Sequence, residues 1–371
     1  MRSPHDPASR ARGGPDTRIV LFGATGYTGK LTAEALVRRG ARPVLAGRNA
    51  DALHALNADL GGGCEVAVAD VSRPETVDAL TRDGGVLVTT VGPFAHYGAP
   101  AVEAAIANGV PYLDSTGEPA FIRQVFEEHG PRSRAPMLTA FGYDYVPGNL
   151  AAAVALDRAG DAATRVDVGY YATGKAGFSA GTFASLTTVK PEGFAFRDGA
   201  VVDERGARHV RSFDVDGDQR DAVSVGSSEH FTLPRLAPGL REVNAYLGWF
   251  GNLSRAVQAG SAVADKVPGV EAAMRAFLKA VPKPEPGSGP DAETRAKGGS
   301  HVVAVAYDAE GNELATARAV GVDGYTFTGE ILAWGALNAH RIDGKGALGP
   351  VEAYGLDLLR EGCESAGLTV R

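Results

Sequence analysis

A short glycine-rich segment of the chain has the spacing of a phosphate-binding turn. It reads Gly23-Ala24-Thr25-Gly26-Tyr27-Thr28-Gly29 and stands between an apolar run and a helical pattern. Such glycines allow a tight turn and a close backbone approach to a pyrophosphate, while the helix that follows offers free amides and a positive dipole end. The segment therefore predicts a dinucleotide site built from Gly23, Thr25, Gly26, Tyr27, Thr28 and Gly29. A tight strand-to-helix turn without a ligand is the alternative.

Arg48 indicates which dinucleotide this site would take. It follows the second apolar run, roughly 20 residues after the glycines, where an NAD-specific site would place Asp or Glu on the ribose hydroxyls. A carboxylate there would repel a 2′-phosphate, whereas a guanidinium can bind one, so we expect NADP(H). An ordinary surface arginine is the alternative. Asp70 ends the third apolar run, and we expect it either near the adenine or as a helix-capping residue.

Three further clusters of small and polar residues follow the fourth, fifth and sixth apolar runs. Ligands of open α/β sheets bind outside the carboxyl ends of the strands, so all three clusters are predicted to face one crevice. Within the first cluster, Val91, Gly92 and Pro93 are expected beside the inner ribose or the nicotinamide. The clusters are Thr90-Val91-Gly92-Pro93-Phe94, Asp114-Ser115-Thr116-Gly117-Glu118 and Gly142-Tyr143-Asp144-Tyr145-Val146-Pro147.

A reductase often needs a proton donor beside the hydride acceptor. Tyr97 and Asp144 are the candidate catalytic residues because both lie on these strand-end loops. A packing aromatic and a loop-holding aspartate are their alternatives. Candidate substrate contacts share the same loops or follow a strand of the second domain. They are His96, Tyr143, Tyr145, Lys175 and Ser179.

The elements that position these residues alternate along the first part of the chain. Apolar runs with little polar alternation suit parallel strands buried on both faces, and helical patterns separate them. This alternation predicts an α/β fold, a Rossmann doubly wound parallel sheet. The runs are Ile19–Phe22, Pro43–Ala46, Val66–Ala69, Val86–Val91, Val110–Leu113 and Met137–Phe141.

Beyond about residue 160 the pattern changes to half-buried strands in which apolar and polar residues alternate. This predicts a second, α+β domain with a mixed or antiparallel sheet. We expect a disordered tail over 1–16, the Rossmann domain over 17–160, the substrate domain over 161–344, and a segment 345–371 that packs back on the first domain. The apolar stretch 243–281 is interpreted as helical, forming part of the core, a lid or a membrane contact.

Composition limits the class of protein. The chain has 371 residues, 44% of them hydrophobic and 22% charged, which is typical of a globular protein. A net charge of −7 argues against nucleic acid as the main partner. Two cysteines without a CxxC pattern and histidines without metal spacing predict no metal site. No run of 18 apolar residues occurs, so we expect no transmembrane span and a cytoplasmic protein, with a homodimer left open.

The sequence resembles the saccharopine dehydrogenase-like NADP-binding family, in particular the bacterial branch that includes trans-acting enoyl reductases. The resemblance rests on the glycine-rich segment, Ala46-Gly47-Arg48 and the three strand-end clusters. Two later segments, Gly181-Thr182 and Gly349-Pro350-Val351, also resemble that branch. The resemblance implies a Rossmann domain, a second domain that covers the cofactor, and hydride transfer with NADP(H).

Three functions stay open at this point. The first is an NADP(H)-dependent oxidoreductase that reduces a C=C bond of an enoyl, polyketide-like or lipid-like substrate, an apolar small molecule. The second is a saccharopine-reductase-like enzyme that acts on the C=N bond of an amino-acid derivative. The third is a non-catalytic NADP-binding regulator. The resemblance to this family restricts the choice of cofactor more than it restricts the choice of substrate.

Overall fold

The computed structural model describes residues 17–174, 177, 179–188, 193–266, 285 and 287–371. Seven parallel strands form one sheet in the order β15-β6-β5-β4-β1-β2-β3. The order of the first six strands, 6-5-4-1-2-3, is that of a Rossmann fold, in which the chain starts at β1, builds outward to β3 and then continues from β4 on the other side of β1. The strands are β1 (Ile19–Phe22), β2 (Val44–Gly47), β3 (Val66–Val68), β4 (Val86–Thr89), β5 (Tyr112–Asp114), β6 (Pro136–Leu138) and β15 (Gly346–Ala347).

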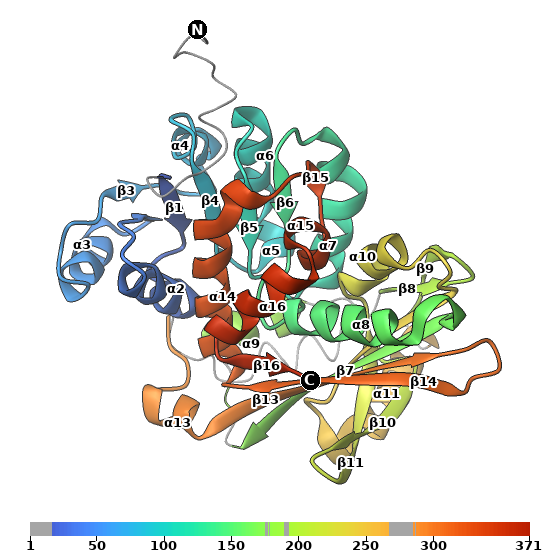
Figure 1. Cartoon of the computed structure of the whole chain (residues 1–371). Coiled ribbons are helices and arrows are strands. Elements are labelled where there is room, and N and C mark those ends of the chain that lie inside the picture. Colours follow the sequence, from blue (N-terminus) through green and yellow to red (C-terminus); the bar gives the residue numbers. More distant parts are fainter. Residues whose placement is uncertain (1–16, 175–176, 178, 189–192, 267–284, 286) are drawn as a thin grey trace, which may run out of the picture.

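Helices cover both faces of this sheet, which confirms the doubly wound α/β prediction (Figure 1). The central strands β1, β2 and β4 are buried at every position, as their continuous apolar runs predict. The helices are α2 (Tyr27–Arg38), α3 (Ala50–Asp59), α4 (Pro74–Ala79), α5 (Phe94–Tyr97), α6 (Ala99–Asn108), α7 (Pro119–Gln124) and α14 (Gly324–Asn338).

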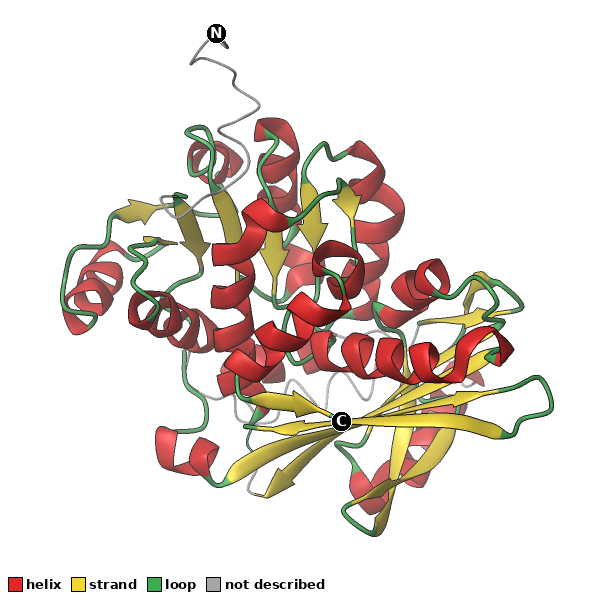
Figure 2. Cartoon of the chain, in the orientation of Figure 1, coloured by secondary structure: helices red, strands yellow, loops and turns green. Residues whose placement is uncertain are grey.

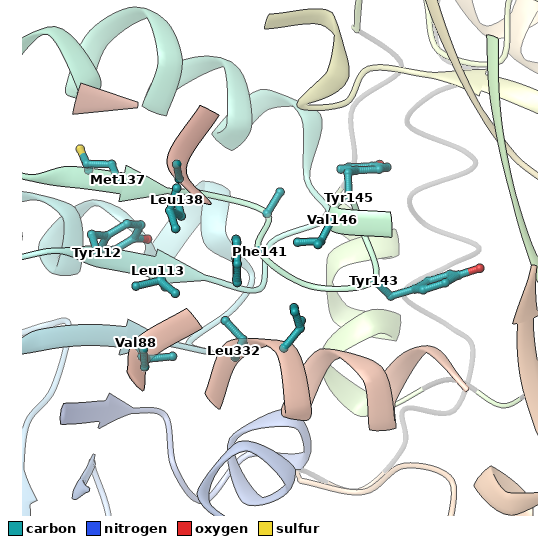
Figure 3. Packing of buried hydrophobic residues seen from close by; sticks show 14 of the residues in the cluster. Val88, Tyr112, Leu113, Met137, Leu138, Phe141, Tyr143, Tyr145, Val146 and Leu332 are labelled. Carbon is teal, nitrogen blue, oxygen red and sulfur yellow. The ribbon is translucent and has the colours of Figure 1, made fainter. Parts of the chain in front are cut away.

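Helix α14 reaches this sheet from far along the chain. It packs along α2 and contacts β4 and β5. Glycines make the close approach possible, because a Cβ at Gly329 would lie 2.9 Å from the Leu31 Cβ, and one at Gly335 would lie 2.5 Å from the Phe141 ring. Figure 3 shows Leu332 of α14 among Phe141 and the strand residues around it. A helix apolar on every side is typical of such a buried position.

The second sheet has nine strands and is mixed, as expected. Its main path runs β10-β11-β12-β7-β13-β14-β16, and every pair is antiparallel except β12 with β7. Strand β8 pairs with β12 and β9 at the edge. The strands are β7 (Arg165–Gly174), β8 (Phe194–Arg197), β9 (Ala200–Asp203), β10 (Val210–Val215), β11 (Asp218–Val225), β12 (Glu242–Leu247), β13 (Gly298–Tyr307), β14 (Glu313–Gly321) and β16 (Leu368–Val370).

Helix α8 (Val146–Ala159) joins the two sheets. Figure 2 shows it lying over one face of the second sheet, and it contacts β7, β13 and β14. Its residues 146–156 are all buried, because it packs against the second sheet and against neighbouring helices of the later part of the chain. The remaining helices are α9 (Ala180–Thr188), α10 (Glu229–Leu236), α11 (Ser254–Lys266), α13 (Ala292–Ala296), α15 (Pro350–Tyr354) and α16 (Leu356–Ser365).

Two segments differ in detail from their sequence interpretation. The stretch 243–281 is not one helical unit, because residues 242–247 form β12 and α11 begins only at Ser254. Strand β12 pairs with β7 and β11, and its residues, Glu242–Leu247, alternate polar and apolar side chains, which is the pattern of a strand. Residues 345–371 contribute β15 to the first sheet and β16 to the second. The domain boundaries remain predictions, and the predicted tail 1–16 lies outside the described residues.

Candidate active site

A cavity of about 280 Å³ lies at the carboxyl ends of the strands of the first sheet, and the second sheet closes its other side. The first sheet supplies the start of α2 and the segments after β5 and β6. The second sheet supplies the end of β7, the turn after β12 and the start of β13. The start of α14 completes the wall. The lining includes Thr28, Ser115, Gly142, Tyr143, Asp144, Ala172, Thr173, Thr182, Gly248, Trp249, Arg295, Gly298, Asp323, Tyr325 and Thr328.

The glycine-rich loop has the geometry of a phosphate cradle. Gly23 has a φ of +91°, and a Cβ there would lie 2.8 Å from the Thr90 Oγ1. A Cβ at Gly29 would overlap the Gly23 carbonyl oxygen. No side chain caps the N-terminus of α2, and its first turn holds no acidic residue. The loop therefore offers a close backbone surface and a positive helix end, so these residues fit the pyrophosphate of NADP(H).

Arg48 and Asp70 lie where their strands end. Arg48 is exposed directly after β2, before Asn49, whose side chain caps α3 by accepting the Ala52 N–H at 3.0 Å. The Asp70 Oδ1 accepts the N–H and the hydroxyl of Ser72, each at 2.8 Å. These bonds, with a smaller effect of the Arg48 charge, hold the pKa of Asp70 below its usual range. Asp70 thus organises a turn beside Arg48, and its contact with adenine remains a prediction.

The turn after β4 is fixed to its surroundings by a glutamate that the sequence analysis did not single out. The buried Glu118 carboxylate accepts the N–H groups of Phe94 at 2.8 Å and Ala95 at 2.9 Å, and the Ser185 hydroxyl at 2.7 Å. The Thr90 hydroxyl donates to the Gly23 carbonyl at 3.1 Å. These contacts hold Val91, Gly92 and Pro93 next to the glycine-rich loop, as the strand order predicts.

Asp144 presents a carboxyl group with unusual surroundings to the cavity. Its Oδ1 is buried and has no hydrogen-bond partner among the described residues. Gly117 leaves room for the group, since a Cβ there would lie 3.0 Å from the Asp144 Oδ2. Burial raises the pKa of Asp144 to about 7. The carboxyl therefore holds a proton near neutral pH, which suits a general acid.

The two tyrosines beside Asp144 lie apart from each other in Figure 3, and both rings pack edge-on against Tyr170. Tyr143 lines the cavity, but its hydroxyl donates to the Tyr171 carbonyl at 2.9 Å, so it ties the segment after β6 to β7. Tyr145 is fully buried, and its ring packs edge-on against Tyr170 at 5.4 Å between centroids. The structure places the Tyr145 ring in the core and not in the cavity lining.

Three other predicted residues, His96, Tyr97 and Ser179, are not part of the cavity lining. His96 and Tyr97 are exposed on α5, with Tyr97 45% exposed. The short helix turns both side chains toward the surface while Phe94 faces the core. Ser179 lies close to the cavity, where its N–H donates to the Tyr325 hydroxyl at 2.7 Å. Lys175 lies outside the described residues.

The sequence analysis missed Tyr325 and Arg295, which both line the cavity. The Tyr325 hydroxyl shares a 2.9 Å hydrogen bond with the Thr182 hydroxyl, and its ring packs edge-on against Tyr27 at 5.1 Å. Asp323 caps α14 by accepting the Tyr325 N–H at 3.0 Å. That Asp-Gly start of an apolar helix is the signal that could have located Tyr325. Nothing in the local sequence marks Arg295.

A second buried carboxyl lies behind the Asp144 segment. The Tyr170 hydroxyl donates to the Glu229 Oε1, and it lies 3.3 Å from the Tyr145 carbonyl oxygen. Gly148 makes room, because a Cβ there would overlap the Tyr170 hydroxyl. Burial, with a smaller contribution from the Asp144 charge, raises the pKa of Glu229 to about 7.

This raised pKa predicts a pH-dependent stability. Between pH 5 and about 7 the unfolded chain, with a glutamate pKa near ~4.3, loses this proton while the folded chain keeps it. Glu229 therefore lowers the free energy of unfolding as pH rises through this window. We expect Glu229→Gln to make the slope of that free energy against pH more positive, measured by urea denaturation. Glu293→Gln, on the surface of α13, is the control and should leave the slope unchanged. Equal slopes for Glu229→Gln and the wild type would contradict the expectation.

The fold and the site together define a Rossmann-type NADP-binding oxidoreductase. Residues 19–137 match the family described as the saccharopine dehydrogenase NADP binding domain. A Mycobacterium tuberculosis protein named "Putative trans-acting enoyl reductase" is 32% identical over 408 aligned positions, covering 95% of this chain and 96% of that protein. The chain therefore belongs to the trans-acting enoyl reductase family.

A second relative supports the family, and a solved structure shows the fold. A Mycobacterium leprae protein named trans-acting enoyl reductase is 42% identical over 147 residues, which cover 37% of this chain and 35% of that protein. The saccharopine dehydrogenase (L-Glu forming) of Saccharomyces cerevisiae has the same fold, with a TM-score of 0.61, 13% identity, and coverage of 96% of this chain and 99% of that one. The predictions of the family, of NADP(H) and of an oxidoreductase are confirmed.

The described residues show neither a metal cluster nor a membrane-spanning helix. No group of three or more His, Cys, Asp or Glu side chains there could hold a metal ion. None of the helices in those ranges has the length and apolar character needed to cross a bilayer.

The choice of NADP over NAD has its own test at Arg48. We expect Arg48→Glu to raise the Kd of NADPH roughly 10-fold or more, because a charge-assisted pair with the 2′-phosphate is replaced by repulsion. The Kd of NADH should change little. Titration of the intrinsic fluorescence with each cofactor measures both values. Equal losses for the two cofactors would remove Arg48 from the site.

Proposed function

We propose that this protein reduces the C=C bond of an apolar enoyl-type substrate, with Asp144 as the proton donor. The observation that carries the proposal is Asp144, whose buried Oδ1 lacks a partner and which lines a cavity that adjoins the cofactor loop. NADPH, when bound, supplies the hydride. The alkene carbon that gathers negative charge then takes its proton from the Asp144 carboxyl, so one hydride and one proton are added across the bond.

The walls of the cavity support an apolar substrate. Second-sheet residues close it with Ala172, Gly248 and Trp249, and the Tyr143 and Tyr325 rings lie on the other walls. A mostly apolar lining limits the water around the hydride acceptor and strengthens the electrostatic effect of the buried Asp144 carboxyl. The names of the mycobacterial relatives support the same reaction.

A substrate panel tests the reaction. NADPH oxidation is followed at 340 nm with enals, enoyl thioesters and cyclic imines of similar size. We expect turnover with the enoyl compounds and formation of the saturated product, identified by mass spectrometry. Turnover of cyclic imines alone would favour the saccharopine-reductase-like alternative, and no turnover together with tight NADPH binding would favour the regulator.

The contacts of His96, Tyr97, Tyr143, Tyr145, Lys175 and Ser179 with substrate remain predictions, as do a homodimer and a cytoplasmic location. Of these residues, Tyr143 has the best support, because its ring lines the cavity beside Asp144. Ser179 is joined through Tyr325 to the same wall. Tyr97 has the least support as a catalytic residue, because its side chain is exposed on α5.

A further inference from the structure

The described segment 287–297, which we call the crossing segment, lies against the glycine-rich loop although it leads into the second sheet. A Cβ at Gly287 would lie 3.3 Å from the Thr25 carbonyl oxygen, and one at Gly289 would lie 2.6 Å from the Tyr27 ring. The two glycines thus let one backbone lie against another. The Tyr27 hydroxyl also donates to the Pro290 carbonyl. The first turn of α2 is therefore covered by the crossing segment.

Arg295 places a positive charge where the crossing segment meets the first turn of α2. Its Nη1 donates to the Tyr27 hydroxyl at 3.0 Å and to the Pro290 carbonyl at 2.9 Å, and its guanidinium carbon lies 5.9 Å from the centroid of the Tyr27 ring. Both hydrogen-bond partners are neutral, so they orient the guanidinium without neutralising its charge. The side chain also lines the cavity. A guanidinium has five N–H donors, and these bonds use only those of Nη1.

The position of this charge points to an anionic ligand. Arg295 contacts Tyr27, the first residue of α2, and an uncapped helix N-terminus by itself attracts anions. The whole chain carries a net charge of −7, so an anionic ligand needs local positive groups. Arginine matches the planar, bidentate geometry of phosphate oxygens.

We propose that Arg295 binds the pyrophosphate of NADP(H), so that a residue from the second-sheet side of the cavity completes the cofactor site of the Rossmann sheet. Tyr27 acts as a positioning residue, because its hydroxyl fixes the guanidinium. The crossing segment then couples cofactor binding to the closure of the substrate cavity, because it contributes residues both to the cofactor site and to the cavity wall. This inference rests on NADP(H) binding and not on the identity of the reduced bond.

Direct binding of NADPH, measured by calorimetry without any acyl substrate, tests the assignment. We expect Arg295→Gln to raise the Kd roughly 10-fold to 100-fold, as the loss of hydrogen bonds to a charged group does. The variant should also show a weaker dependence of Kd on salt, because one charge no longer contributes. Lys297→Gln is the matched control, since it removes the same charge from the same segment at an exposed residue paired with Glu293. Its Kd should stay within about twofold of the wild type.

The affinity for a second ligand shows whether Arg295 acts on the pyrophosphate or on another part of the cofactor. 2′-AMP carries the adenine and the 2′-phosphate but no pyrophosphate, so Arg295→Gln should bind it as the wild type does. An unchanged Kd for NADPH would overturn the proposal, and so would an equal loss of affinity for NADPH and 2′-AMP. An unchanged NADPH Kd with a raised KM for an anionic substrate would assign the charge to the substrate instead. If the protein turned over no enoyl substrate, the measured Kd of NADPH would still test the role of Arg295.

Discussion

Asp144→Asn is expected to lower kcat by roughly 10²-fold to 10⁴-fold, the range that loss of a general acid causes. An amide of nearly the same shape fills the same space beside Gly117 but cannot supply the proton. Because no hydrogen bond joins this carboxyl group to the glycine-rich loop among the described residues, the Kd of NADPH should remain close to the wild-type value. Steady-state kinetics with the best enoyl substrate, together with NADPH titration, separates the two effects.

The pH profile makes this test specific. Burial raises the pKa of Asp144 to about 7, and only the protonated carboxyl can act as the acid. The kcat of the wild type should therefore fall as pH rises through about 7, whereas the residual rate of Asp144→Asn should lack that limb. Asp323→Asn is the matched control, because it removes a carboxylate from the same cavity and keeps an oxygen that can cap α14. Equal losses in the two variants, or an unchanged pH limb, would exclude Asp144 as the proton donor.

Gly29→Ala should abolish most of the affinity for NADPH. The added methyl group would overlap the Gly23 carbonyl oxygen and lie 2.9 Å from the Ala24 Cα. Both neighbours are backbone, so the loop and α2 must separate, at a cost of about 1–3 kcal/mol or more. We expect the Kd of NADPH to rise by roughly 10-fold to 100-fold, since each ~1.4 kcal/mol is a factor of ten. Thermal unfolding with and without NADPH measures this as a smaller ligand-induced rise in Tm.

The control for this variant is another helical glycine with free space around it. A Cβ at Gly260 in α11 meets no atom within 4 Å, so Gly260→Ala should leave NADPH binding unchanged. Its Tm should stay the same or rise slightly, because alanine favours a helix interior. If Gly29→Ala bound NADPH with the wild-type Kd, the glycine-rich loop could not be the pyrophosphate site.

Local sequence was enough to predict the Rossmann sheet and its cofactor loop. Each central strand is a continuous apolar run, and the turn chemistry at Gly23 and Gly29 depends on neighbours a few residues away or on an adjacent strand end. The sequence predicted a second sheet of mixed or antiparallel strands, but it did not predict which of these strands pair with each other. Strand β12 in particular was taken as helical, because it was grouped with the apolar residues that follow it, although Glu242–Leu247 itself alternates polar and apolar residues.

The candidate site, like the fold, could be predicted from the sequence only in part. The segment around Asp144 could be predicted because it follows a strand of the parallel sheet, and the carboxyl ends of such strands meet at one edge. The surroundings of its carboxyl could not, because they come from Gly117 and from elements more than a hundred residues away. The exposure of Tyr97 and the burial of Tyr145 depend likewise on which way a short helix and a core ring turn.

The sequence by itself determined the dinucleotide loop, the parallel strands of the first sheet and Arg48 at the end of β2, since these follow from local turn chemistry and the pattern of apolar residues. Only the tertiary structure decided which polar groups share the cavity. It placed Arg295 beside Tyr27, 268 residues earlier in the chain, and it buried the Asp144 Oδ1 without a partner. Long-range packing sets the solvation and the neighbours of a charged group, and these properties decide whether it holds a proton, binds an anion or faces water.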